Sequence, residues 1–139
     1  MRNHNTPLVF EARVLKPYAQ PVENEDLVCG SVYFFLTFLG SGLLLPTLEP
    51  VVFVGRNLEQ GESGRVYFQD LASYENGIRY ETEPQEERVE YVTQTPPLLD
   101  NASFYTGSEN ELGHVFTFEH ALDQLLACSL RRRAHESRG

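Results

Sequence analysis

The hydrophobic pattern of the chain is dominated by residues 27–48, a run of 22 positions without a charged side chain. A helix of about 20 apolar residues can cross a bilayer. Here, glycines interrupt the run, prolines close it, and acids rather than Lys or Arg flank it, which argues against a membrane span. The segment VYFFLTF is rich in aromatic and β-branched residues, so a sheet is the better interpretation.

Residues 32–39 are predicted to form a strand with two apolar faces, because side chains alternate along a strand. One face would carry Val32, Phe34, Leu36 and Phe38, and the other Tyr33, Phe35, Thr37 and Leu39. Such a strand belongs in the middle of a sheet that is covered on both sides. Alternatively, its second face contacts a second subunit, which would make the protein a homodimer. A turn at residues 40–42 and prolines at 46 and 50 would end the run.

Several shorter apolar segments are bounded by Gly, Pro and polar residues, a pattern typical of strands joined by loops. The predicted strands are residues 8–14, 51–56, 65–69, 78–80, 88–93, 103–105 and 114–117. Segments 51–56 and 65–69 form the clearest hairpin. In its second arm Val66 and Phe68 would face the core, whereas Tyr67 and Gln69 would face water.

The clearest helical pattern lies in residues 118–133, where Thr117 is a suitable N-cap and basic residues at the end agree with the helix dipole. The apolar or small residues of one broad arc are Phe118, Ala121, Leu122, Leu125, Leu126, Cys128, Ser129 and Leu130. This arc is predicted to cover strand 32–39. A short helix is expected within residues 70–77, with Asp70 as its N-cap.

Together these elements predict an α+β domain: an antiparallel sheet of about five or six strands with one long C-terminal helix packed on one face. A chain of 139 residues fits a single domain, 1–139. Residues 1–7 and 134–139 are expected to be flexible tails.

Charge narrows the classes of partner. With 20 acids and 11 bases the net charge is −9, and residues 131–139 carry +3, so the rest of the chain carries −12. Such a body repels phosphate backbones, which disfavours nucleic acid and favours a basic protein partner. Alternatively, the acids serve only to keep the protein soluble. The N-terminal residues lack the apolar core of a signal peptide, so a cytoplasmic location with Cys29 and Cys128 as reduced thiols is expected.

Motifs for cofactor chemistry are missing from the sequence. It contains no Walker loop, no GxGxxG and no CxxC, so we assign no cofactor, no metal site and no catalytic residue. His114 and His120 are only weak candidates for the ligands of a metal site. A thiol nucleophile at Cys29 is disfavoured, because the residue is predicted to be buried in an apolar strand.

Tyrosines and acids gather in the middle of the chain, a composition suited to protein recognition. The predicted partner-binding residues are Tyr67, Tyr74, Tyr80, Glu81, Glu83, Glu86, Glu87 and Tyr91. We therefore expect a non-catalytic acidic protein that binds another protein, such as a bacterial immunity or inhibitor protein for a basic toxin. Ordinary packing of the tyrosines and a solvated acidic loop are the alternatives.

A competing hypothesis is a small enzyme or ligand-binding domain with a pocket between sheet and helix. Its candidate residues are Asp70, Glu75, His114 and Tyr105. A hollow with converging polar groups would favour this hypothesis.

Overall fold

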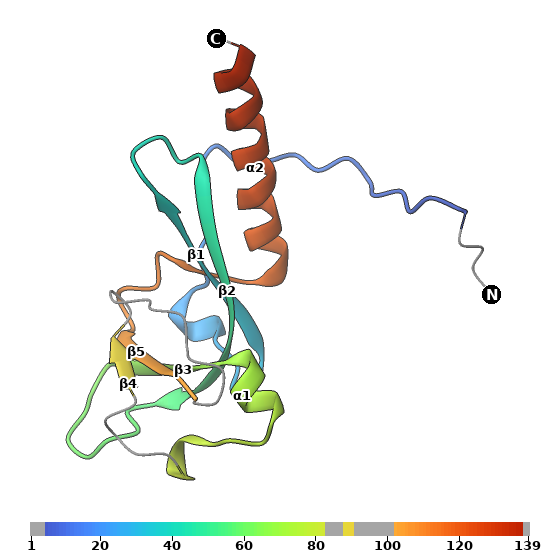
Figure 1. Cartoon of the computed structure of the whole chain (residues 1–139). Helices are drawn as coiled ribbons and strands as arrows, with labels where there is room; N and C mark the ends of the chain where they lie inside the picture. Colours follow the sequence, from blue (N-terminus) through green and yellow to red (C-terminus); the bar gives the residue numbers. More distant parts are fainter. Residues whose placement is uncertain (1–4, 83–87, 91–101, 138–139) are drawn as a thin grey trace.

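The computed structural model of the chain describes residues 5–82, 88–90 and 102–137 (Figure 1). Its strands are β1 Val32–Leu39, β2 Leu45–Arg56, β3 Arg65–Asp70, β4 Arg88–Glu90, β5 Phe104–Ser108 and β6 Val115–Phe116. Its helices are α1 Leu71–Glu75 and α2 Phe118–Ser137, and short 3₁₀ turns are η1 Asn24–Asp26 and η2 Tyr80–Thr82. The sheet order is β4-β5-β3-β2-β1-β6, antiparallel except for the β4–β5 pair. The predicted α+β fold, with one long C-terminal helix packed on an antiparallel sheet, is confirmed.

The middle of strand β1 is covered on both faces, as predicted, whereas Val32 and Leu39 at its ends are 41 and 59% exposed. Leu36 packs with Phe116 of β6 and Ala121 of α2, and Phe34 and Phe38 join this cluster. The opposite face, with Tyr33 and Phe35, belongs to the main core. That part of the second face is therefore filled by the protein's own side chains and is not open to a second subunit.

The sheet curls around the main core. Strands β2 and β3 stand between β1 and β5, and neighbouring strands lie about 4.8 Å apart, so a flat sheet would separate β1 from β5 by roughly 14 Å. The rings of Phe35 on β1 and Tyr105 on β5 nevertheless lie 5.3 Å apart, centroid to centroid. The curl allows one concave face to enclose Phe35, Phe68 and Tyr105 together.

Strand β2 is longer than predicted, because Pro46 and Pro50 lie inside it instead of ending the run. They pair with Phe38 and Phe34 of β1, while β3 pairs with β2 only from Val51 onward. Along residues 45–50 the other edge of β2 has no strand neighbour in the described part of the chain. A proline without an N–H is tolerated at such an edge.

The predicted strand at residues 8–14 is wrong. This segment is extended but unpaired, and Val9, Phe10 and Val14 are 81 to 94% exposed. Figure 1 shows it running past α2 and away from the body as an N-terminal arm, residues 5–15. Its apolar alternation resembles that of a strand, but it pairs with no strand of the described sheet.

Helix α2 runs along β1 and β2 (Figure 1). It packs mainly on β1 and on Phe116 of β6, and it buries fewer side chains than its broad apolar arc predicted because this support is narrow. Ala121 and Cys128 are buried, whereas Leu126 and Leu130 are 38 and 55% exposed. The arc is thus divided between a stripe on the sheet and a stripe that faces outward.

Three local predictions need correction. Residues 78–80 do not start a strand, since Tyr80 begins the 3₁₀ turn η2. Cys29 is exposed in the turn before β1 and is not a buried strand residue. The supposedly wet face of β3 is buried, because Tyr67 and Gln69 are both 0% exposed.

Across the described residues, no helix combines the length and apolarity needed to cross a membrane.

Candidate functional site

Two hollows lie on opposite sides of the junction between β3 and α1. Successive residues of a strand point to opposite faces, so Gln69 lines one hollow and Asp70 the other. Their volumes, about 570 and 560 Å³, fall in the usual range for ligand pockets. We call the first the aromatic hollow, lined among others by Phe53, Gln69, Tyr74, Arg79, Tyr80 and Glu81. The second is the Glu49 hollow, lined among others by Phe35, Thr37, Thr47, Glu49, Asp70 and Leu71.

Aromatic packing fixes the wall of the aromatic hollow. The Tyr80 ring lies edge-on to Tyr67, at 5.4 Å, and to Phe104, at 5.3 Å. Tyr80 donates its hydroxyl hydrogen to Glu59, and Tyr67 donates to Glu62 at 2.6 Å. Two carboxylates therefore stand directly behind the aromatic wall.

A cation already rests on one ring of this hollow. The Arg79 guanidinium lies 3.8 Å from the centroid of the Tyr74 ring. It also donates hydrogen bonds to the carbonyl oxygens of Tyr74 and Ile78, both at 2.8 Å. The geometry is that of a cation–π contact, so the Tyr74 ring already carries a cation of the chain itself.

Gln69 has an unpartnered acceptor next to this hollow. Its Nε2 donates to Ser73 Oγ at 2.8 Å and to the Ile78 carbonyl oxygen at 2.9 Å. The carbonyl accepts only, so it fixes which end of the amide is nitrogen. In the described part of the chain Oε1 is buried without a hydrogen-bond partner. A buried acceptor in this state costs about 1 to 3 kcal/mol.

The Glu49 hollow contains a hydrogen-bonded acid. Tyr105 donates its hydroxyl hydrogen to Glu49 Oε1 at 2.6 Å. Burial is the main cause that raises the pKa of Glu49, and the charge of Asp70 raises it further, against the Tyr105 hydrogen bond. Burial, and then the bond to Glu49, also raises the pKa of Tyr105. Tyr105 is therefore the hydrogen-bond donor, and the raised pKa makes the neutral carboxyl of Glu49 more favourable than it would be in water.

Asp70 is occupied by a structural role. One of its oxygens accepts from the Ser73 N–H at 2.9 Å, as an N-cap of α1. The other accepts from Ser73 Oγ at 2.6 Å and from the Ser103 N–H at 2.8 Å. Three donors hold this carboxylate between α1 and the start of β5.

The structure brings together part of the predicted partner-binding set. Tyr74, Tyr80 and Glu81 line the aromatic hollow. Tyr67 is buried behind it and is not available as a surface anchor. The remaining four, Glu83, Glu86, Glu87 and Tyr91, lie outside the described residues.

The four residues of the pocket hypothesis do not converge. Asp70 and Tyr105 both lie close to Glu49, beside α1 and not beneath α2. Glu75 is exposed, and His114 packs its ring 4.9 Å from Phe35. Burial lowers the pKa of His114.

Sequence reasoning missed Glu49 and Gln69. Glu49 shares the face of Val51 and Phe53, so an acid in phase with core residues was the available signal. Gln69 shares the face of Tyr67, which the sequence assigned to water. No short-range pattern shows that this face is covered by the segment from α1 to η2.

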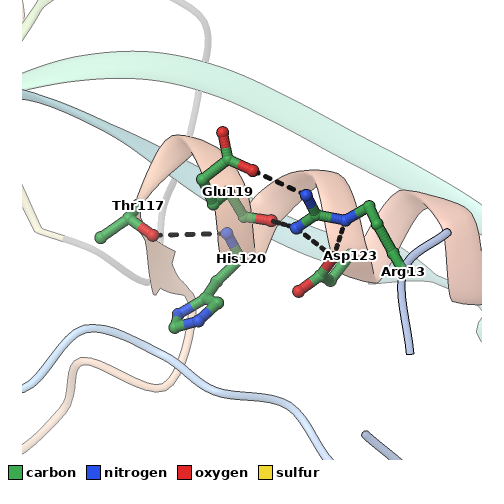
Figure 2. Close-up of polar contacts among 5 residues, drawn as sticks. All are labelled: Arg13, Thr117, Glu119, His120 and Asp123. Carbon is green, nitrogen blue, oxygen red and sulfur yellow. Dashed lines mark hydrogen bonds and ion pairs between the residues drawn. The ribbon is translucent and has the colours of Figure 1, made fainter. Parts of the chain in front are cut away.

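The start of α2 holds a separate polar cluster (Figure 2). Thr117 Oγ1 accepts from the His120 N–H at 3.3 Å, as an N-cap does. Arg13 forms ion pairs with Glu119, at 2.9 Å, and Asp123, at 2.6 Å, and so fastens the N-terminal arm to α2. Within the described residues no three His, Cys, Asp or Glu side chains gather in a way that could hold a metal ion.

Comparison of the chain with protein-family models, curated proteins and solved structures found no match.

Proposed function

We propose that this chain is a non-catalytic protein-binding domain whose aromatic hollow receives a basic side chain of its partner. The observation that carries the proposal is the convergence of Tyr74, Tyr80 and Glu81 on one hollow beside the unpartnered oxygen of Gln69. Aromatic side chains ringed by polar groups are common anchors in protein recognition.

The charge around the hollow supports a cationic partner. Glu81 is exposed at the hollow, and Glu59 and Glu62 stand behind its wall. Among the described lining residues Arg79 is the one cation and Glu81 the one acid, so the excess of carboxylates comes from Glu59 and Glu62 behind the wall. A Lys or Arg side chain would meet an attractive potential at this surface.

The finer assignment is part of the same proposal. A small acidic domain that blocks a basic toxin, as bacterial immunity and inhibitor proteins do, fits the charge of −9. Nucleic acid is a poor partner for such a surface. We place the protein in the cytoplasm, where the free thiols of Cys29 and Cys128 are stable.

Selection of peptides from a random phage-displayed library tests this proposal. The selected peptides are expected to be enriched in Lys and Arg, and calorimetry should show binding that weakens at least about tenfold between 50 and 500 mM NaCl, because salt screens exposed charges. Glu81→Gln is expected to weaken binding. Glu136→Gln, which removes the same charge near the end of α2, is the matched control and should not.

Selected peptides without an excess of basic residues would contradict the proposal. An equal loss of affinity in both Glu variants would also contradict it, since the effect would then come from net charge and not from the hollow.

A second candidate is a ligand-binding or catalytic role for the Glu49 hollow. It is favoured by one observation, the partly buried Glu49 with a raised pKa beside Tyr105. Groups of this kind occur at active sites, although structural networks produce them as well.

A further inference from the structure

Helix α2 has an outward stripe that no helix or strand of the described residues covers. Leu122, Leu126 and Leu130 line a groove of about 520 Å³ between α2 and the N-terminal arm. Phe10 and Leu15 of the arm form its other side. Leu126, Leu130 and Phe10 are 38, 55 and 81% exposed, so the groove is apolar and open.

Helical geometry places this stripe apart from the face that packs on the sheet. At about 100° per residue, Leu122 and Leu130 lie within roughly 40° of Leu126 around the helix axis. The buried residues Ala121 and Cys128 lie roughly 140° or more from Leu126. Packing on β1 therefore leaves the outward stripe free.

The stripe is self-complementary in charge as well as in shape. Glu119 lies seven residues before Leu126 and Arg133 seven residues after it, both within about 20° of the stripe. In an antiparallel pair of α2 helices with Leu126 at the twofold axis, Glu119 of one copy faces Arg133 of the other. Leu122 likewise faces Leu130. The side chain of Glu119 is 65% exposed despite its ion pair with Arg13, so it can meet a second cation.

We infer that two copies of this chain associate through antiparallel α2 helices centred on Leu126, with each N-terminal arm flanking the joined helices. A twofold interface repeats one patch on both subunits, which this stripe allows. The exposed apolar side chains of the arm, Val9 and Phe10 among them, extend the patch beyond the helix. A partner of another kind would not need acid and base at equal distances from Leu126.

Sedimentation equilibrium of the full chain gives the first test. The expected mass is twice 15.8 kDa, and Leu126→Asp is expected to give a folded monomer because it places two carboxylates at the axis. Circular dichroism confirms that the variant is folded. A wild-type chain that stays monomeric at high micromolar concentration would overturn the inference.

Disulfide crosslinking tests the register, in a Cys29→Ser background because Cys29 is exposed. Leu126→Cys should crosslink with itself, and Leu122→Cys should crosslink with Leu130→Cys when the two are mixed. Ala134→Cys is the matched control, because two such residues would lie about 24 Å apart along the paired helices. A dimer in which Leu126→Cys does not crosslink would overturn this geometry.

Charge exchange tests the orientation. Glu119→Arg and Arg133→Glu should each weaken the dimer by roughly tenfold, because two symmetric pairs are lost at a few-fold each. The double variant should restore it, since the pairs re-form with exchanged signs. Asp123 still holds Arg13 in every variant. A double variant weaker than either single one would contradict antiparallel pairing.

Discussion

At the scale of single residues, burial and not residue type decides which acids and amides matter. The chain has 20 acids, and among them Glu49 is half-buried beside Tyr105, where burial raises its pKa. Gln69 differs from ordinary surface amides because its side chain is fully buried with one oxygen unpartnered. Both are visible only once the strands are assembled.

The pH dependence of stability follows from Glu49. Its pKa is raised in the folded state, so folding takes up a proton between the ordinary pKa of Glu and the raised value. Stability from this group is therefore lost as pH rises through that window. We expect Glu49→Gln, which keeps an oxygen for Tyr105, to be more stable than the wild type at neutral pH. The difference should vanish below the ordinary Glu pKa.

Urea unfolding from pH 3.5 to 8 measures this difference. Glu75→Gln, at an exposed position, is the control and should show no such pH dependence. A constant offset between Glu49→Gln and the wild type at every pH would show that packing, and not ionisation, causes the change.

At the scale of elements, the conformation of each segment depends on the segments that pack against it. The prolines of β2 persist because one edge of that strand is unpaired along residues 45–50 among the described residues. The arm, residues 5–15, contains apolar residues but pairs with no strand, and Arg13 holds it on α2 through Glu119 and Asp123. Sequence periodicity cannot distinguish these outcomes, because both depend on neighbours distant in the chain.

Helix α1 depends on the Asp70 side chain for its stability. Five residues are too few for a stable isolated helix. Asp70→Ala removes the N-cap and leaves the buried Ser103 N–H without its acceptor. We expect a loss of about 2 to 4 kcal/mol in the free energy of unfolding, measured by urea denaturation.

Asp70→Asn separates the two parts of this loss. The amide oxygen can still cap α1, so a smaller effect is expected. A loss below about 0.5 kcal/mol for Asp70→Ala would mean that the carboxylate is dispensable, as at ordinary surface positions.

At the scale of the whole molecule, the two proposed surfaces are independent. The aromatic hollow lies by α1 and η2, whereas the outward stripe lies on α2, at the other end of the sheet (Figure 1). A dimer through α2 would leave the aromatic hollow of each copy open. It would therefore gain avidity for a partner with two basic sites.

The monomeric Leu126→Asp variant checks this independence. It is expected to bind a selected basic peptide with the affinity of the wild type, measured by calorimetry with a monovalent peptide. Loss of peptide binding in a folded Leu126→Asp monomer would show that the hollow depends on dimerisation.

The sequence by itself determined the elements with strong local periodicity and the overall charge. Strand β1, the β2–β3 hairpin and helix α2 follow from alternation or helical spacing of apolar residues, and the Asp70 cap follows from a local motif. Composition predicted Tyr74, Tyr80 and Glu81 as partner-binding residues, but it did not predict that they line one hollow.

Only the tertiary structure decided what covers each face. The curl of the sheet brings Phe35 to Tyr105, and the narrow support under α2 leaves Leu126 outside. The segment from α1 to η2 covers Tyr67 and Gln69. Local patterns report which side of an element is apolar, because they reflect positions a few residues apart. What meets that side depends on contacts between distant segments, and these are fixed only when the sheet closes around its core.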